Sequence, residues 1–208
     1  MDVTIIGTGN MARGLGRRLI AGGHNVTVLG RRAEDAEAVV GDIGGGQAGR
    51  TGDAIADDVV MLAVYYPDAQ AAVEQYGDGL SGKVIIDITN PVNESFDGLV
   101  TPPDGSAAQE LARSAAGARL VKAFNTTFAS TLIAGDVDGT PLDVFIAGDD
   151  EDARKQVAEL VASGGLNPVD AGPLEWARAL EGFQLLHMAL QLRDSGLAWG
   201  STIKIVVP

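Results

Sequence analysis

The 208-residue sequence contains no cysteine and only two histidines. The lack of cysteine excludes disulfides, thiol catalysis and cysteine-ligated zinc or iron–sulfur sites. Two histidines are too few for a histidine-rich metal centre, so we predict no metal site. No apolar run reaches the roughly 18 residues that a membrane helix needs, and the first residues lack the basic start of a signal peptide. We therefore expect a cytoplasmic protein with no membrane partner.

Basic residues are also few. The sequence has 15 of them and 28 acidic residues, so its formal net charge is -13. A field this negative repels nucleic acid and anionic membranes. The apolar fraction of 46% excludes wholesale disorder, and the length suffices to bury a sizeable core. Five of the 15 basic residues fall within one short stretch, which suggests a local anion site. These residues are Arg13, Arg17, Arg18, Arg31 and Arg32.

Apolar segments alternate with helical patterns along most of the chain. The expected strands are short and rich in Val, Ile and Leu, and they cover residues 1–6, 25–29, 59–64, 84–88, 119–123, 142–147 and 168–171. Helices are expected between them, over residues 11–21, 33–40, 69–76, 107–116 and 150–163. The glycine-rich residues 41–52 are interpreted as a loop. This alternation predicts an α/β fold with a doubly wound parallel sheet over residues 1–172.

The last 36 residues, 173–208, depart from the alternation. A longer helix is expected over residues 174–193, followed by a turn over 196–200 and a final strand over 203–207. We interpret this part as a small carboxy-terminal cap of one helix and one strand. Together with the sheet, the cap is expected to form the cleft for a second cofactor or substrate.

One sequence motif points to chemistry. Gly7, Gly9 and Ala12 form a G-x-G-x-x-A pattern, which follows the first expected strand directly and opens the first helix. Gly7 permits a tight turn, Gly9 lets the backbone approach a pyrophosphate, and Ala12 allows the helix to pack closely on the strand. The helix N-terminus then faces the phosphates with its free N–H groups and its dipole. In this context the pattern predicts a dinucleotide-binding site.

The end of the second strand distinguishes between the two nicotinamide dinucleotides. An NAD site normally places an acidic residue there to hold the ribose 2′-hydroxyl, whereas this sequence reads Gly30-Arg31-Arg32. Two guanidinium groups can hold a 2′-phosphate with charge-assisted hydrogen bonds. We therefore predict NADP(H) as the cofactor, bound by Arg31 and Arg32. The three arginines of the first helix are expected to be solvated.

The carboxyl ends of the expected strands carry no pair of side chains poised for acid–base catalysis. Residues 65–67, 89–91 and 124–127 lie there and supply mainly tyrosines, amides and hydroxyls. Asp87 and Lys122 lie within strands, and we interpret both as structural. Direct hydride transfer between two redox cofactors requires proximity, orientation and the exclusion of water rather than a protein acid or base. We therefore predict such a transfer and no catalytic side chain.

At these positions the sequence resembles the F420-dependent NADP oxidoreductase family. The resemblance covers nearly the whole chain and rests on residues 3–16 and 30–32, on Asp87-Ile88-Thr89-Asn90-Pro91, on Val121-Lys122-Ala123-Phe124-Asn125-Thr126 and on Ser201-Thr202-Ile203-Lys204-Ile205. It implies a Rossmann domain, a small carboxy-terminal domain and a cleft between them. In that cleft NADP(H) exchanges a hydride with the deazaflavin coenzyme F420. The family also implies a homodimer.

The resemblance implies roles for individual residues, in addition to the glycine motif and the two arginines. The expected cofactor contacts are Gly7, Thr8, Gly9, Asn10 and Met11 at the pyrophosphate, Arg31 and Arg32 at the 2′-phosphate, and Val64, Tyr65, Pro67, Asn90 and Asn125 around the nicotinamide. Thr126, Trp176 and His187 are expected to line the pocket of the second cofactor or substrate. For His187, its place on the apolar stripe of the last expected helix favours a packed and hydrogen-bonded core histidine, and a place in this pocket beside Trp176 is the alternative. An ordinary flavin or a small substrate stays open as the hydride acceptor.

Two other functions stay open at this point. The segment Gly9-Asn10-Met11-Ala12 resembles the opening of pyrroline-5-carboxylate reductases, which are imine reductases with a long helical dimerisation domain. Only 36 residues follow Gly172 here, too few for such a domain. The second alternative is a catalytically silent NADPH-binding module that reports redox state to a partner, because such a module needs no acid–base group either.

Overall fold

A computed structural model describes residues 1–115, 117–193 and 196–206. The strands are β1 (Asp2–Ile6), β2 (Asn25–Gly30), β3 (Gln47–Arg50), β4 (Val59–Leu62), β5 (Val84–Asp87), β6 (Arg119–Lys122), β7 (Asp136–Val137), β8 (Thr140–Pro141), β9 (Asp143–Gly148) and β10 (Asn167–Gly172). The α-helices are α1 (Asn10–Ala21), α2 (Ala33–Ile43), α3 (Tyr66–Tyr76), α4 (Ala107–Ser114), α5 (Ala129–Ala134), α6 (Glu151–Ser163) and α7 (Ala177–Arg193). Two 3₁₀ turns, η1 (Gly77–Leu80) and η2 (Leu174–Trp176), complete the described elements.

The main sheet has eight strands in the order β10-β9-β6-β5-β4-β1-β2-β3. The six strands from β3 to β6 in this order all pair in parallel. Strand β9 pairs antiparallel with β6, and β10 pairs in parallel with β9 through the crossover helix α6. The strand order reverses between β1 and β4, which is where doubly wound sheets bind their ligands. The predicted doubly wound α/β architecture is therefore confirmed, with an antiparallel junction at β6 that the sequence did not indicate.

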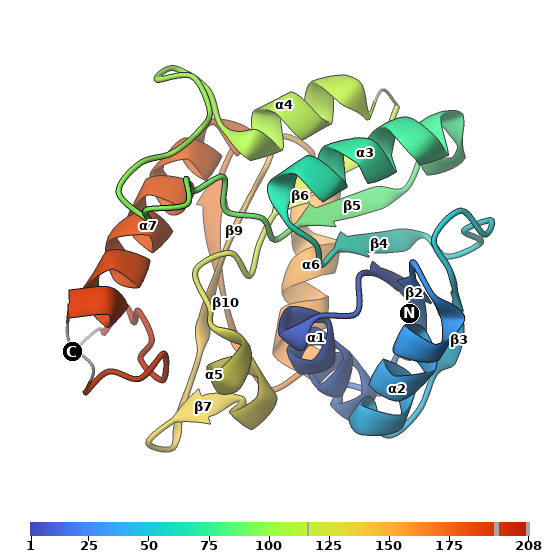
Figure 1. Ribbon diagram of the computed structural model, residues 1–208, viewed down its shortest axis with the longest axis horizontal. Coiled ribbons are helices and arrows are strands. Elements are labelled where there is room, and N and C mark those ends of the chain that lie inside the picture. Colours follow the sequence, from blue (N-terminus) through green and yellow to red (C-terminus); the bar gives the residue numbers. More distant parts are fainter. Residues whose placement is uncertain (116, 194–195, 207–208) are drawn as a thin grey trace.

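Helices cover both faces of the sheet (Figure 1). On one face α1, α2 and α6 bury apolar side chains such as Leu15, Val39 and Val157 against the strands. On the other face α3 and α4 lie side by side and bury Val73 and Leu111. Because both faces are covered, the central strands β4 and β5 are buried at every position. Helix α7 packs against α4 beside the β9 end of the sheet.

The prediction of a loop over residues 41–52 is wrong. Helix α2 continues to Ile43, whose side chain packs where a Cβ on Gly16 would stand. Residues Gln47–Arg50 then form β3, which pairs in parallel with the end of β2. An edge strand of four residues gains its stability from backbone hydrogen bonds to its neighbour, so it needs no run of β-branched side chains. Its sequence, Gln-Ala-Gly-Arg between glycine-containing turns, therefore carries no apolar signal that would predict a strand.

The final strand predicted over residues 203–207 is also wrong for its described part. Residues 201–206 belong to no helix or strand, and residue 207 lies outside the described residues. Side chains hold this segment instead: Lys204 donates to the buried carboxylate of Asp143 at 2.5 Å, and the backbone N–H of Ile205 donates to the same carboxylate at 2.8 Å. Ile203 packs against the apolar cluster of Phe145 and Leu180. Hydrogen bonds to the Asp143 side chain thus hold this segment in place of the expected strand pairing.

None of the helices in the described part of the chain combines the length and the apolar composition of a membrane-spanning segment.

Candidate functional site

A cavity of about 1110 Å³ opens at the carboxyl edge of the sheet, around the point where the strand order reverses. The predicted cofactor residues that line it are Gly7, Thr8, Gly9, Asn10, Met11, Arg31, Val64, Tyr65, Pro67, Asn90 and Asn125. Arg32 is not part of the lining. The structure therefore brings together residues from the ends of β1, β2, β4, β5 and β6, as expected for a parallel sheet.

The glycine-rich loop forms one end of this cavity. Gly7 has a φ of 126° and passes so close to the end of β4 that a Cβ would stand 2.2 Å from the carbonyl oxygen of Ala63. Around Gly9, by contrast, nothing lies within 4 Å of the position of a Cβ, so the backbone faces open space. A phosphate can therefore approach the loop without meeting a side chain at Gly9.

The N-terminus of α1 is free to receive an anion. Its N-cap residue Gly9 offers no side-chain hydrogen bond, and its first turn contains no acidic residue. Helices α2 and α6 differ, because both carry acidic side chains in their first turn, and Asp150 caps α6. The first N–H groups of α1 consequently keep their hydrogen-bonding capacity and the positive end of the helix dipole.

The two adjacent arginines after β2 have different surroundings. Arg31 lines the cavity, and no ion pair is formed by its side chain with any residue that the structure describes. Arg32 is the N-cap residue of α2, and its guanidinium group pairs with Glu34 at 3.2 Å and with Asp35 at 2.9 Å. Arg31 is thus available to an anionic ligand, whereas Arg32 is already paired on its own helix.

The expectation that all three arginines of α1 are solvated is wrong for two of them. Arg13 donates to the carbonyl oxygen of Thr8 at 2.7 Å and pairs with Asp42. Arg18 is half-buried and donates to the carbonyl oxygen of Ile133. Arg17 is exposed, as expected. The helix spacing of these residues could not show that Arg13 reaches back and supports the glycine-rich loop.

Two tyrosines follow β4, and both line the cavity but differ in exposure. Tyr65 is 84% exposed at the cavity. Tyr66 is buried; its hydroxyl donates to the carboxylate of Glu110 and accepts from the side-chain amide of Gln70. Burial and the hydrogen bond to Glu110 raise the pKa of Tyr66. The Tyr66 phenol therefore stays neutral and joins α3 to α4.

A reciprocal pair of amides bridges the ends of β5 and β6. Asn90 donates to the backbone carbonyl of Asn125 at 2.9 Å, and the side chain of Asn125 donates to that of Asn90 at 3.0 Å. The Asn125 amide also donates to the carbonyl of Leu180 in α7 at 3.1 Å. Phe124 adopts a φ of 61° to turn the chain here, a conformation that non-glycine residues seldom adopt. The pair thus fixes this end of the cavity against α7.

Asp87 and Lys122 are buried next to the cavity residue Thr89, and Lys122 also contacts a second carboxylate, that of Glu181. The ammonium group of Lys122 is fully buried, 2.8 Å from Asp87 and 3.0 Å from Glu181 of α7. The carboxylate of Glu181 also accepts from the backbone N–H groups of Ala107 and Ala108 at the start of α4. The network contributes no residue to the cavity lining. Glu181 was not predicted from the sequence, although an acidic residue on the apolar stripe of a helix was a visible signal.

The three residues predicted for the second-cofactor pocket lie outside this lining. Thr126 is buried, and Trp176 is 52% exposed. His187 is buried, stacks on Phe128 with ring centroids 4.5 Å apart, and hydrogen-bonds Gln184 and Ser201. Burial lowers the pKa of His187. This geometry favours the core histidine, which was the interpretation preferred from the sequence.

The cavity wall next to these residues is formed by two others. Phe128 follows β6, and Met188 belongs to α7; both line the cavity. Sequence analysis did not identify either of them. Phe128 lies two positions after Thr126, and Met188 directly follows His187, so close sequence neighbours of two predicted residues line the cavity.

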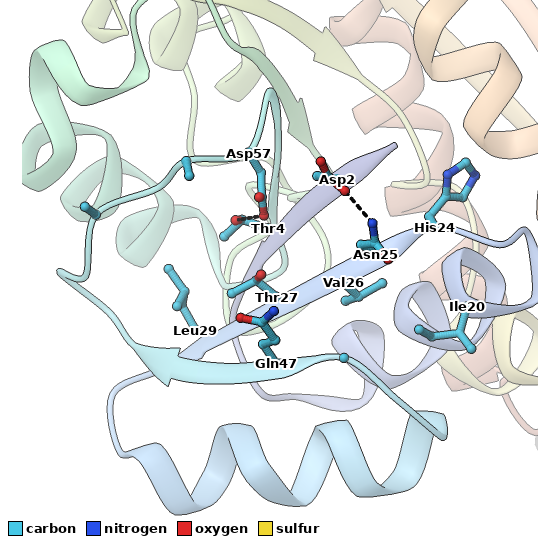
Figure 2. A pocket seen from close by; sticks show the side chains of 13 residues that line it. Asp2, Thr4, Ile20, His24, Asn25, Val26, Thr27, Leu29, Gln47 and Asp57 are labelled. Carbon is cyan, nitrogen blue, oxygen red and sulfur yellow. Dashed lines mark hydrogen bonds between the residues drawn. The ribbon is translucent and has the colours of Figure 1, made fainter.

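A second hollow, of about 590 Å³, lies at the opposite, amino-terminal edge of β1, β2 and β3. Figure 2 shows its polar side chains, among them Thr4, Thr27 and Gln47, which pair across the three strands in register. Thr4 donates to Asp57 at 2.6 Å. Residues 51–58 join β3 to β4 without a helix, so this face of the sheet is left open. None of the predicted site residues lies here.

The sequence is similar to those of known NADP-dependent reductases. A family model described as "NADP oxidoreductase coenzyme F420-dependent" matches residues 2–91. The F420-dependent NADP reductase of Methanothermobacter marburgensis is 31% identical over 213 residues, which cover 93% of this chain and 94% of that protein. The metalloreductase STEAP3 of Rattus norvegicus is 30% identical over 88% of this chain, and the chain spans only 36% of that longer protein.

Solved structures give the same result. A candidate F420-dependent NADP reductase from Arthrobacter sp. FB24 superimposes with a TM-score of 0.85 at 26% identity, and the match covers 99% of both chains. A hypothetical protein of Sinorhizobium meliloti gives a TM-score of 0.77 at 31% identity, over 84% of this chain and 86% of the other. The pyrroline-5-carboxylate reductase of Coxiella burnetii shares the fold alone, at 19% identity. By its sequence and its fold, the chain belongs to the family of F420-dependent NADP reductases.

Proposed function

We propose that this protein is an oxidoreductase that transfers a hydride between NADP(H) and coenzyme F420, the reaction that the names of its full-length relatives describe for those proteins. The observation that carries the proposal is a single cavity with an anion-binding end and an amide-and-apolar end. No lysine or histidine is among the residues that line it. Asp68 and Glu94 are the acidic residues of this lining, and a lining with so few acid–base groups suits a site that holds and orients two cofactors rather than one that exchanges protons with them.

The anion-binding end fits a dinucleotide that carries a 2′-phosphate. The uncapped start of α1 and the open space at Gly9 suit the pyrophosphate. Arg31 stands at the end of β2, where the ribose 2′ position of a dinucleotide lies. Its guanidinium group can make two parallel hydrogen bonds to a phosphate. Arg32 then supports the site indirectly, because it holds the first turn of α2 in place.

The other end fits two stacked ring systems. Asn90 and Asn125 supply the amides, while Phe128 and Met188 supply an apolar wall that excludes water. If both cofactors bind in such a site, NADPH would supply the hydride and F420 would accept it together with one proton from solvent, so the residues of the lining would supply proximity and orientation rather than an acid or base. We place F420 against Phe128 and Met188.

The proposal also includes a role for the carboxy-terminal cap and for the three residues predicted to line the second-cofactor pocket. Met188 of α7 supports the division into residues 1–172 and a cap, 173–208, that supplies one wall of the cleft. His187 would act on the second cofactor through the ring of Phe128, which it contacts. Thr126 and Trp176 stay predictions for this pocket, as does the cytoplasmic location of the protein.

The direct test is the absorbance of F420 in the presence of NADPH and the purified protein. We expect the absorption band of oxidised F420 to decline, with FMN and FAD as control acceptors that react more slowly. NADPH binding without any loss of the F420 band would contradict the proposed reaction. NADPH oxidation by FMN or FAD at the same rate would identify a general flavin reductase instead.

We further propose that the protein is a homodimer that pairs through α7. One side of this helix exposes Phe183, Leu186 and Leu190, which are 41%, 55% and 43% exposed and follow one another at helical spacing. Trp176 continues the stripe in the preceding turn. A stripe of large apolar side chains on the surface of a soluble enzyme is typical of a protein interface.

Sedimentation of a matched pair of variants tests the homodimer. Leu186→Glu places a charge within the stripe and is expected to convert dimers to monomers. Leu192→Glu is the control, because Leu192 is equally exposed, at 57%, but lies on another side of α7. A wild-type protein that sediments as a monomer would refute the proposal.

A further inference from the structure

Lys122 uses its whole hydrogen-bonding capacity within the protein. Its ammonium group donates to Asp87 at 2.8 Å and to the backbone carbonyl of Thr89 at 2.6 Å, and it lies 3.0 Å from Glu181. An ammonium group has three N–H donors, so none is left for a ligand. Burial alone would lower the pKa of Lys122, but the two carboxylates outweigh it and the pKa is raised. Lys122 therefore stays charged and exchanges no proton with a cofactor.

The ion pair of Lys122 and Asp87 holds Thr89 from both sides. The carboxylate of Asp87 accepts from the backbone N–H of Thr89 at 2.8 Å, while the ammonium group binds the carbonyl oxygen of the same residue. Both contacts with Thr89 are buried. The peptide between Thr89 and Asn90 consequently has a fixed orientation, at a point where both residues line the cavity.

This orientation determines where the N–H of Asn90 points. In a trans peptide the C=O and the following N–H point in opposite directions, and the structure describes no cis peptide. The C=O of Thr89 points into the interior, toward Lys122, so the N–H of Asn90 points away from it, on the side of the cavity. This N–H has no hydrogen-bond partner among the described residues, and Pro91 has no N–H to offer.

We propose that Lys122 is a positioning residue whose contact with Thr89 directs the N–H of Asn90 at the carboxamide oxygen of the nicotinamide. The inference rests on the proposed binding of NADP(H). A fixed backbone donor orients the carboxamide, and therefore the plane of the ring, without any rearrangement of the protein on binding. Glu181 extends the same control to α7, since it joins Lys122 to the helix that supplies Met188.

Amide NMR of the ¹⁵N-labelled wild-type protein tests the donor directly. Titration with NADP⁺ should move the amide proton of Asn90 downfield, whereas 2′,5′-ADP, which lacks the nicotinamide, should leave it in place. The amide of Gly9 reports on the phosphate end in the NADP⁺ titration. If Gly9 responds and Asn90 does not, the inference fails and the proposed cofactor stands. If neither responds, the proposed NADP(H) site fails, and the inference with it.

The variant Lys122→Met tests the positioning role. It keeps an unbranched side chain up to the position of Cε but removes the ammonium group and so frees the Thr89 carbonyl, and the NADP⁺-dependent shift of Asn90 should therefore disappear. We expect kcat with F420 to fall by about 10- to 100-fold, with an unchanged Kd for 2′,5′-ADP. A purely structural role would weaken 2′,5′-ADP binding as well.

Glu181→Gln is the matched control, because it leaves both contacts that hold Thr89 and should preserve the Asn90 shift. If Lys122→Met folds and keeps the shift, the positioning role is refuted. If it does not fold, the wild-type titration decides whether Asn90 is the donor.

Discussion

At the scale of single residues, two neighbours of identical type have different surroundings. Arg31 and Arg32 form the same pattern in the sequence, but only Arg32 has acidic partners among the described residues, at Glu34 and Asp35. An arginine without a partner loses no existing ion pair when it binds a phosphate. Arg31 should therefore contribute most of the preference for NADP(H) over NAD(H).

The variant Arg31→Ala should raise KM for NADPH by about 10- to 100-fold, because a hydrogen bond to a charged group contributes about 1.5–3 kcal/mol. KM for NADH should change little, because NADH has no 2′-phosphate. Arg32→Ala should have a smaller effect on NADPH, and the exposed Arg17→Ala should have none. Steady-state kinetics with both dinucleotides measures all three. Equal changes for NADPH and NADH in Arg31→Ala would refute the assignment of the 2′-phosphate.

His187 makes a second prediction at this scale, about stability. Burial lowers its pKa from 6.5 in the folded protein. Above pH 6.5 the histidine is neutral in both states, and as the pH falls below 6.5 the unfolded chain binds a proton that the folded chain resists. The free energy of unfolding should therefore fall in this range.

Urea unfolding at about pH 7.5 and about pH 5.5 measures this loss. The variant His187→Gln should lose less stability than the wild type between the two values. His24 has a lowered pKa as well, through burial and the nearby amino terminus, and it is present in both proteins. The comparison therefore isolates His187, and parallel losses in the two proteins would contradict the prediction.

At the scale of elements, the segment over residues 201–206 is held by side chains rather than by strand pairing. The carboxylate of Asp143 accepts from Lys204, from the N–H of Ile205 and from Asn167. Burial alone would raise the pKa of Asp143, but these donors outweigh it and the pKa is lowered. The carboxylate thus stays charged and depends on its donors.

Lys204→Met should destabilise the fold by about 1–3 kcal/mol, because it leaves a buried carboxylate without its charged donor. The matched control is Lys155→Met, since Lys155 pairs with Glu151 on the exposed surface of α6 and should matter little. Chemical denaturation measures both. We also expect faster proteolysis near residues 201–206 in Lys204→Met alone. A variant as stable and as resistant as the wild type would show that the apolar contacts of Ile203 suffice.

The elements that the sequence predicted well share one property, which is a continuous apolar signal. Strand β4 is a buried apolar run, β1 and β5 are mainly apolar and are buried except at Asp2, and the G-x-G-x-x-A motif predicted the junction of β1 and α1. Strand β3 and the segment after α7 have no such signal, because one gains stability from backbone pairing at an edge and the other from contacts with Asp143. Contacts of this kind join positions far apart in the chain, so local periodicity cannot show them.

The same distinction applies to the candidate site. The loop contacts at Gly7 and Gly9 were predictable, because a local motif determines them. Phe128, Met188 and Glu181 were not, because their roles depend on how α7 packs beside the sheet. The interpretation of Lys122 and Asp87 as structural was correct in excluding them from the cavity lining. The sequence alone could not show that Glu181 joins them or that they hold Thr89.

At the scale of the whole molecule, the net charge of -13 opposes the compact state. Nineteen of the 28 acidic residues are aspartates, and only four of the 15 basic residues are lysines. Such a composition suits a solution of high ionic strength or a GC-rich genome. Of these two explanations for the acidic composition, only adaptation to salt requires that added salt stabilise the fold.

Thermal unfolding in KCl measures whether the fold gains stability from salt. From about 0.01 M to about 1 M salt, the Debye length shrinks from about 30 Å to about 3 Å. Repulsion among the surface carboxylates is then screened, while the buried contacts of Lys122 with Asp87 and Glu181 are protected from the ions. We therefore expect the midpoint to rise by several degrees, most steeply at the low end of the range. An equal concentration of sucrose separates general exclusion effects from screening, because sucrose carries no charge. A midpoint that stays constant or falls with KCl would mean that repulsion among the acidic residues does not limit the stability of this fold.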